Sequence, residues 1–218
     1  MITEKNTIKY EALFNDEHTH RYLWKRVWQK DKPLAAVICL QPSLSDNIIQ
    51  DTTTTLIVNN IARLESYGGV VILNLYSMLT NKLSFRFNSD DDLSHKENDD
   101  CILKAAEECD VVVLAWGKGG DTNERIAQRA ERVIQMLLPF EDKLYVISDG
   151  EREFLHPLTP KLRNSWELVK FDPHAPKTSK TVCPKKTVKE EIPEVAQDTD
   201  EEDNDTTDDT DDDTVLPE

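Results

Sequence analysis

Four polar signatures follow apolar runs of this sequence, and their residue types suit the recognition of a planar ligand. The side-chain amide of Asn74 can offer both a donor and an acceptor to the edge of such a ligand. The imidazole of His156 can stabilise negative charge that develops on a departing group. Tyr76 comes two residues after Asn74 and could stack on a flat ring. The four signatures are Gln41-Pro42-Ser43, Asn74-Leu75-Tyr76, Trp116-Gly117 and His156-Pro157.

Short apolar runs precede these signatures and predict the strands that position them. Runs such as VVIL and VVVLAW do not alternate with polar residues, which is typical of parallel strands covered on both faces. The predicted strands span residues 34–40, 70–73, 111–116, 143–148 and 165–171. The predicted helices span residues 52–66, 97–109 and 122–138, with Asp51 or Thr52 as the N-cap of the first.

The order of these elements predicts an α/β fold, a three-layer sandwich with a mostly parallel central sheet. Strands alternate with helices along the chain, which implies right-handed crossovers between parallel strands. Residues 7–14 and 20–28 alternate apolar with polar side chains and predict an N-terminal β-hairpin. Because parallel strands align their carboxyl ends, we expect the four signatures to meet at the sheet edge where α/β proteins bind ligands.

Each signature also has a purely structural interpretation. Asn74 could bond backbone groups at the end of its strand, and Asp51 could act only as a helix cap. Trp116 could belong to the core, and His156 could be an ordinary loop residue. Ser43 is not in a G-x-S-x-G motif and the spacing assembles no Ser/His/Asp triad, which argues against hydrolase chemistry of that kind.

Two further segments could contribute to a site. The GKGGD segment, residues 117–121, joins a predicted strand to a helix for which Asp121 or Thr122 is the expected N-cap. Backbone N–H groups at that helix start could hold a phosphate next to Lys118, although the spacing is neither a P-loop nor G-x-G-x-x-G. Residues 77–96 form a long predicted loop, and long loops in compact domains are often functional.

The formal charge of −16 is concentrated at the end of the sequence. Residues 190–218 contain 15 of the 42 acidic residues and no Lys or Arg, so the remainder is almost neutral, with 27 acidic and 26 basic residues. Five lysines lie between residues 177 and 189. We therefore expect a single α/β domain over 1–173, a Lys/Pro-rich linker over 174–189 and a disordered acidic tail over 190–218.

Composition also bears on compartment and cofactors. No run of 18 apolar residues and no apolar signal segment is present, so we expect neither a membrane span nor secretion. The four cysteines have no paired spacing, which favours reduced thiols in a cytoplasmic protein. His18-Thr19-His20 has no supporting ligands nearby, so we expect no metal site and no cofactor.

Several of these motifs resemble a bacterial and phage family catalogued as domain of unknown function sixteen-forty-three. The motifs LQPS, D-x-T at Asp51 and Thr53, GGVVILNLY, AWG and HPL occur in the family's order, and RYLWKRVW resembles its start. The likeness covers about residues 20–170. The family pattern has Asn-Pro-Ser where this chain has Gln41-Pro42-Ser43, and the family implies no activity.

A more distant resemblance, to uracil-DNA glycosylases, implies specific roles. In those enzymes a Pro-containing loop positions water, a strand-end Asn reads the flipped base, a Trp-Gly ends the next strand and a His-Pro loop enters the minor groove. The motifs QPSLSD, Asn74, Trp116-Gly117 and His156-Pro157 are similar to that series. The water-activating residue is absent at Gln41, so the resemblance implies that Asp46 or Asp51 substitutes.

The sequence leaves three functions open. The first is a glycosylase-like enzyme whose nucleobase or nucleotide pocket lies at the strand ends. The second is a nucleotide- or DNA-binding regulatory protein without catalysis, because Gln41 replaces the expected group. The third is a tail that mimics a phosphate backbone and occupies a basic protein partner.

Overall fold

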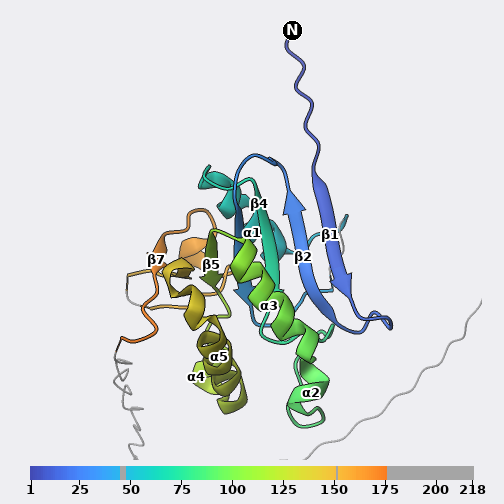
Figure 1. The fold of residues 1–218 in the computed structure, drawn as a ribbon, viewed down its shortest axis with the longest axis vertical. Helices are drawn as coiled ribbons and strands as arrows, with labels where there is room; N and C mark the ends of the chain where they lie inside the picture. The colour runs from blue at the N-terminus through green and yellow to red at the C-terminus, as the bar shows by residue number, and fades with distance from the viewer. Residues whose placement is uncertain (45–47, 151, 176–218) are drawn as a thin grey trace, which may run out of the picture. The chain divides into compact units, whose positions relative to one another are not determined.

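One seven-stranded sheet with helices on both faces organises the part of the chain that the structure describes (Figure 1). The structure is a computed structural model, and it describes residues 1–44, 48–150 and 152–175. The strands are β1 (Lys9–Phe14), β2 (Arg21–Val27), β3 (Leu34–Cys39), β4 (Gly69–Asn74), β5 (Val111–Leu114), β6 (Leu144–Ile147) and β7 (Leu168–Lys170). The helices are α1 (Thr52–Arg63), α2 (Asp90–Leu93), α3 (Lys96–Glu108), α4 (Gly119–Thr122) and α5 (Glu124–Leu137), with 3₁₀ turns η1 (Leu138–Lys143) and η2 (Pro160–Leu162).

The sheet is mostly parallel, as the sequence predicts. Its order is β1-β2-β4-β3-β5-β6-β7, and β4, β3, β5 and β6 run parallel to one another. The predicted hairpin is confirmed as β1 and β2, and β2 pairs antiparallel with β4. The last strand is shorter than predicted and pairs antiparallel with β6 at the other edge.

Two separate cores cover the two faces of the sheet. On one face Ile57 and Ile61 of α1 pack on side chains such as Val37 and Ile72. We call this the α1 face. On the other face α3 and α5 cover the alternate residues of the same strands, and we call it the α3/α5 face. Figure 1 shows α3 and α5 together in front of the sheet. Alternation along each strand therefore decides which layer receives each side chain.

The start of α5 differs from the prediction. Asn123 is the N-cap, because its Oδ1 accepts hydrogen bonds from Arg125 N at 2.9 Å and Ile126 N at 3.3 Å. The predicted caps, Asp121 and Thr122, lie instead in the short helix α4. An Asn side chain can satisfy the first orphan N–H groups of a helix as well as Asp or Thr can, so composition alone did not distinguish the three.

The predicted long loop over residues 77–96 is held in place by α5. It contains α2, which begins with a capping box between Ser89 and Asp92. Arg125 donates to Phe85 O at 2.7 Å and to Asn88 O at 3.1 Å, and its guanidinium lies over the Phe85 ring. Arg125 therefore ties the loop to the α3/α5 face, and Arg129 adds a bond to Ser94 Oγ at 3.3 Å.

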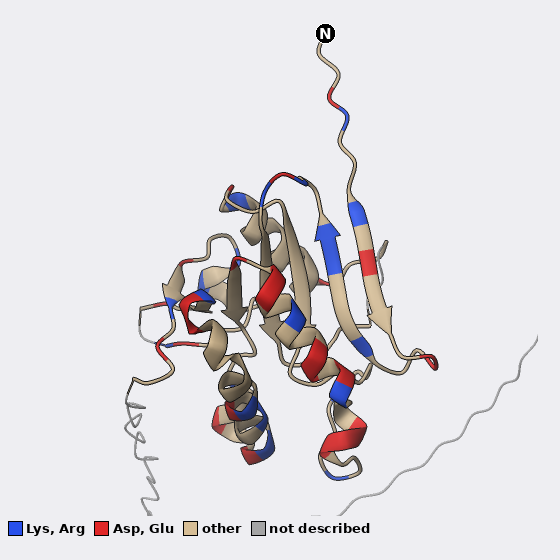
Figure 2. Ribbon diagram, viewed as in Figure 1, with Lys and Arg blue, Asp and Glu red and all other residues tan. Residues whose placement is uncertain are grey.

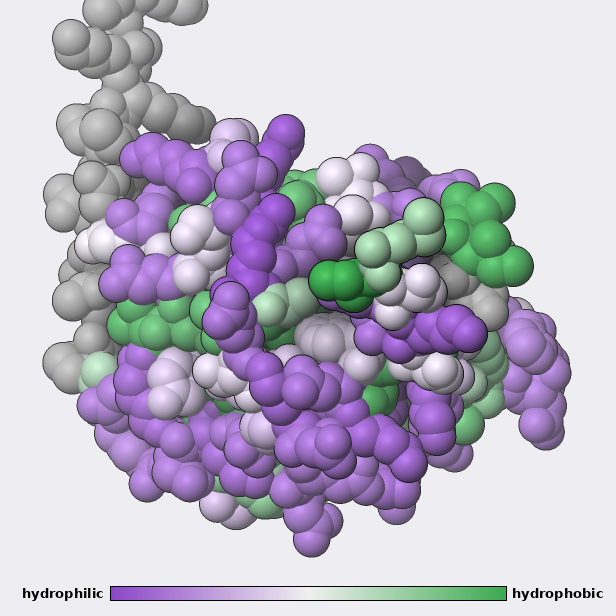
Figure 3. Space-filling model, turned by 90° about the horizontal axis from the view of Figure 1, so that it is seen from above, coloured by the Kyte–Doolittle hydropathy of each residue, from purple (hydrophilic) through white to green (hydrophobic). Residues whose placement is uncertain are grey.

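Charged residues of the two signs gather on different elements of the described residues. Acidic residues gather on α2 and α3, and basic residues gather on β2 (Figure 2). Most of the face seen from above is hydrophilic, with apolar side chains in smaller groups (Figure 3). No helix within the described residues is long and apolar enough to cross a bilayer. The predicted linker beyond Ala175 and the acidic tail lie outside the described residues.

Candidate functional site

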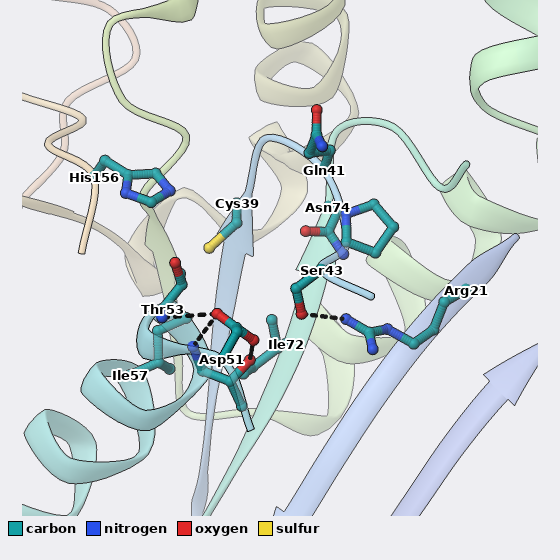
Figure 4. Close-up of a pocket in the computed structure, with 12 residues that line it drawn as sticks. Arg21, Cys39, Gln41, Ser43, Asp51, Thr53, Ile57, Ile72, Asn74 and His156 are labelled. Atoms are coloured by element: carbon teal, nitrogen blue, oxygen red, sulfur yellow. Dashed lines mark hydrogen bonds between the residues drawn. The ribbon is translucent and has the colours of Figure 1, made fainter. Parts of the chain in front are cut away.

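A cavity of about 190 Å³ opens at the carboxyl ends of β3 and β4, beside the first turn of α1 (Figure 4). It lies on the α1 face, because Cys39 and Ile72 belong to that layer. Its walls combine apolar side chains with an arginine, a carboxylate, two amides and an imidazole. The lining residues are Arg21, Cys39, Gln41, Pro42, Ser43, Asp51, Thr53, Thr54, Ile57, Ile72, Asn74 and His156.

The strand order explains why a cavity forms at this place. The chain leaves β3 for β4 on one side, and β5 then pairs with β3 on the other side. Connections that leave neighbouring strands in opposite directions open a crevice at their carboxyl ends, and ligands of α/β proteins bind in such crevices. The predicted signatures after β3 and β4 reach this crevice.

Asn74 ends β4 and is 3% exposed. Its amide is satisfied in the orientation in which Nδ2 donates to Gln41 O at 2.9 Å and to Leu73 O at 3.2 Å. Those bonds use both amide hydrogens, so Oδ1 is the atom with which Asn74 can act on a ligand, as an acceptor. Asn74 therefore does two things: it bonds backbone groups at the end of its strand, and it lines the cavity.

Asp51 is both the N-cap of α1 and part of the cavity wall. Its Oδ1 accepts from Thr53 N at 2.7 Å and Thr54 N at 3.1 Å, and its Oδ2 accepts from Thr54 Oγ1 at 2.6 Å. These bonds satisfy N–H groups at the start of the helix that have no partner within it. They also explain how α1 begins within a run of four threonines, which have poor helix propensity.

His156 reaches the cavity from the loop that follows β6. Its Nδ1 accepts a hydrogen bond from Leu158 N at 3.2 Å, so in the neutral ring Nε2 carries the proton. Burial lowers the pKa of His156, and the charge of Asp51 opposes this shift. The imidazole is therefore a neutral hydrogen-bond donor near pH 7.

Gly117 lets His156 approach. It has φ +76°, and a Cβ at this position would lie 3.0 Å from His156 Cβ. A larger residue would be strained by the backbone angle and would press on the histidine. Gly117 is thus a neighbour of the site, and it does not line the cavity.

Gln41, Pro42 and Ser43 lie between β3 and α1 and line the cavity, and Gln41 also bonds the loop over residues 77–96. Gln41 Nε2 donates to Thr80 O at 3.0 Å, and its amide points away from Cys39 and Asp51 (Figure 4). Ser43 Oγ accepts from Arg21 Nη2 at 3.5 Å. Pro42 is buried in the wall. Asp46, a predicted catalytic residue, lies outside the described residues.

Three predicted ligand-binding aromatic or basic residues do not line the cavity. Tyr76 is fully buried on the α3/α5 face, where its hydroxyl donates to Arg125 O at 3.2 Å. Trp116 lies in the same layer and stacks on Phe154 with ring centroids 5.0 Å apart. Lys118 is exposed at the start of α4. Both aromatic side chains point to the opposite side of the sheet from the cavity.

Sequence reasoning missed Arg21 and Cys39. Arg21 begins β2, and because β2 is antiparallel to β4 its first residue lies at the carboxyl edge of the parallel strands. The predicted N-terminal hairpin contained Arg21, but its pairing with β4 was not predicted. Cys39 ends β3 at the cavity floor, and burial raises the pKa of its thiol to about 12. A protonated, buried thiol is a poor nucleophile, so Cys39 serves as an apolar wall.

A family profile described as "Protein of unknown function (DUF1643)" matches residues 21–158. The chain belongs to this family. The matched region of the DUF1643 domain begins at Arg21 and contains every residue that lines the cavity. No curated protein and no solved structure matches the chain, so these comparisons do not support the resemblance to uracil-DNA glycosylases.

Proposed function

We propose that the cavity binds a single nucleobase and that the domain hydrolyses the N-glycosidic bond joining that base to its sugar. The observation that carries the proposal is that Asn74, Asp51 and His156, from three separate elements, line one small cavity. Its volume of about 190 Å³ is below the roughly 300–1,000 Å³ typical of sites for drug-sized ligands. The space suits one ring, and the sugar remains outside.

Each wall then has a role in binding the base. Ile57, Ile72 and Cys39 supply an apolar surface for the ring. Asn74 Oδ1 accepts a hydrogen bond from a ring N–H. His156 Nε2–H donates to a ring oxygen, where negative charge collects as the base departs.

The hydrolytic step requires an attacking water. In the proposed step the C–N bond to the sugar breaks and the base takes the electron pair, while the water oxygen bonds to the sugar carbon. Asp51 is the carboxylate in the cavity wall that can orient this water and accept its proton. Its hydrogen bonds to the first turn of α1 fix its position.

One observation favours a second function, in which the same cavity binds a base without turnover. Gln41 stands where the glycosylase resemblance implies a water-activating group, and its amide is engaged with Thr80 O and points away from Asp51. Under this alternative Asn74 and His156 still recognise the base, and Asp51 acts as a cap alone.

The test combines a cleavage assay with a binding assay. The full-length protein is incubated with single- and double-stranded DNA carrying uracil and other modified bases, and abasic sites are detected by strand cleavage in alkali. Binding of free bases and nucleosides is measured by calorimetry. Catalysis predicts abasic sites that Asp51→Asn abolishes, whereas binding without turnover predicts heat of binding and no abasic sites.

Matched variants identify the cavity as the site. Asn74→Ala and His156→Ala should each weaken binding by about tenfold, the value of one buried hydrogen bond to a ligand. Asn59→Ala and His174→Ala change the same residue types at exposed positions outside the cavity and should have no effect. No binding by any base, or equal loss in both control variants, would remove the proposal.

The acidic segment over residues 190–218 stays a separate prediction, because it lies outside the described residues. If it imitates a phosphate backbone, a chain truncated after Phe171 should bind DNA more tightly than the full chain at low salt. Equal affinity at every salt concentration would leave the tail no such role.

A further inference from the structure

A second pocket, of about 360 Å³, lies on the hairpin of β1 and β2. We call it the lysine pocket, and it is lined by Lys9, Tyr10, Glu11, Lys25, Val27 and Lys30. Val27 pairs with Gly69, the first residue of β4, so this pocket lies at the amino ends of the parallel strands. The cavity of the proposed function lies at their carboxyl ends, and the two share no lining residue.

Basic segments lie side by side at the start of β1 and the end of β2 (Figure 2). Lys9 is directly opposite Val27. Glu11, two residues further along β1, is directly opposite Lys25. Residues two apart on one strand share a face of the sheet, so these four side chains adjoin one another. Lys30 brings a third ammonium group to the same pocket from the segment after β2.

The lysine pocket lies on the α3/α5 face of the sheet. Burial raises the pKa of the Cys109 thiol at the end of α3 to about 12, and the charge of Lys25 acts in the opposite direction. Arg26, the next residue, points to the α1 face, where its guanidinium lies 5.7 Å from the centre of the Trp24 ring. The alternation along β2 thus keeps this arginine out of the pocket, and lysines supply the positive charge of its walls.

The three ammonium groups of the lysine pocket form no hydrogen bond or ion pair with any residue that the structure describes. Even Glu11, the cross-strand neighbour of Lys25, forms no ion pair with it. Three like charges around one carboxylate leave the pocket with an excess of positive charge. Lys25 is also half-buried, and a charge that loses part of its hydration gains from an anion placed beside it.

From these observations we infer that the lysine pocket binds a small molecule with two or more linked phosphate groups. An ammonium group is a compact point charge that suits phosphate oxygens, whereas paired carboxylate oxygens match the planar fork of an arginine. The volume of about 360 Å³ lies within the range of roughly 300–1,000 Å³ typical of small-molecule sites. Linked phosphates let one ligand reach several lysines at once. The inference goes beyond the proposed function, because it concerns a separate pocket.

Calorimetry on the full-length protein tests this inference with inorganic triphosphate, inorganic phosphate and citrate, at low salt and without divalent cations. We expect triphosphate to bind at least about tenfold more tightly than phosphate, because it reaches more than one lysine. It should also bind more tightly than citrate, which carries carboxylates alone. Added salt should weaken the binding, because the lysines are open to screening. No binding of triphosphate, or equal binding of citrate, would overturn the inference.

Variants assign the binding to the lysine pocket. Lys25→Gln should weaken triphosphate binding about tenfold, and Lys9→Gln and Lys30→Gln about threefold each, because the last two lysines are more exposed. Glu11→Gln removes the carboxylate of the pocket and should tighten binding about threefold. Lys161→Gln changes an exposed lysine of η2 outside the pocket and should leave the dissociation constant unchanged. Thermal unfolding verifies that each variant is folded.

The remaining outcomes also decide the inference. Triphosphate binding that is unchanged in all three lysine variants would place the anion elsewhere and overturn it. A short oligothymidylate tests the backbone of a nucleic acid as the ligand. If the oligonucleotide binds in a Lys25-dependent way while triphosphate does not bind, the inference is overturned in favour of a nucleic-acid surface. The comparison of ligands on the unmodified protein decides even where a variant does not fold.

The proposed function and this inference can fail separately. Asn74→Ala alters the cavity and should leave triphosphate binding unchanged, because Asn74 does not line the lysine pocket. Lys25→Gln should likewise leave the binding of a base unchanged. Loss of triphosphate binding in Asn74→Ala would overturn the inference, since the anion would then occupy the cavity.

Discussion

The two faces of the sheet differ most at the carboxyl ends of the parallel strands, although the same strands supply both. On the α1 face these ends leave a polar cavity, lined by Asn74 and Arg21 among others. On the α3/α5 face they are filled by Tyr76 and Trp116. Asn74 and Tyr76 are two residues apart, yet they lie in different layers because the strand ends between them.

One arginine on each face illustrates this difference. Arg129 of α5 lies on the α3/α5 face, where it forms an ion pair with Asp99 and its Nε donates to Leu75 O at 2.8 Å. Arg21 lies on the α1 face and borders the cavity. Arg129 joins α5 to β4 and α3, whereas Arg21 lines the cavity.

The largest expected effect is a loss of stability on the α3/α5 face. Trp116→Ala removes a core side chain that stacks on Phe154, and it should lower the free energy of unfolding by about 4 kcal/mol. Urea denaturation measures this loss. Because Trp116 does not line the cavity, the dissociation constant for a bound base should change less than about threefold under conditions where the variant is folded. A large loss of affinity without a loss of stability would place Trp116 in the site instead.

Breaking the buried ion pair should have the next largest effect. Arg129→Met keeps most of the side-chain volume and leaves the Asp99 carboxylate without its close partner, at a cost of roughly 3 kcal/mol. The exposed pair of Lys104 and Glu108 is the control, and Lys104→Met should cost less than about 0.5 kcal/mol. If the two variants lose the same stability, the ion pair of Arg129 does not stabilise the α3/α5 face more than the exposed pair does.

A smaller effect separates the two roles of Asp51 on the α1 face, as the N-cap of α1 and as the group that activates water. Asp51→Ala should cost about 1 kcal/mol of stability, because two N–H groups of α1 lose their acceptor. Asp51→Asn keeps an acceptor at the cap and should retain most of that stability. If Asp51 activates water, both variants lose cleavage, whereas a cap-only role predicts that Asp51→Asn remains as active as the unmodified protein.

The smallest expected effect is a dependence of stability on pH. Burial lowers the pKa of His156, so between that lowered pKa and about 6.5 the unfolded chain binds more protons than the folded one. The contribution of His156 to stability is therefore complete above about pH 6.5 and is lost as pH falls below it. Burial and the neighbouring His95 lower the pKa of His20 in the same direction.

Unfolding of His156→Asn across about pH 5 to 8 measures this contribution. The variant should show a shallower decline of stability toward low pH than the unmodified protein. The decline that remains should come in part from His20, whose Nδ1 is 2.9 Å from Ser77 Oγ on the other side of β4. An unchanged slope would mean that His156 is as solvated in the folded protein as in the unfolded chain.

Much of the fold could be predicted from the sequence because its signals are local. Continuous apolar runs identified the four parallel strands, and their alternation with helices predicted the layers. The edge of the sheet that carries Gln41, Asn74 and His156 followed from the parallel arrangement. The N-cap of α1 at Asp51 followed from residue type.

The details of the site depend on information that a single run of sequence does not carry. Which face Trp116 occupies depends on the register of β5 with β3, and the direction of the Gln41 amide depends on a distant carbonyl at Thr80. Arg21 was missed because its place at the edge follows from an antiparallel pairing between β2 and β4. Tertiary pairing, and not local propensity, set these three positions.

The most direct test of the central claim uses the chain's five histidines as reporters. Their ring resonances are recorded by NMR in labelled protein while uracil is added. The account predicts that the resonance of His156 moves with saturation. His20 and His95, which stack on each other with centroids 3.8 Å apart and do not line the cavity, should stay fixed. Movement of His20 and His95 with a fixed His156, or no movement at all, would contradict a nucleobase site on the α1 face.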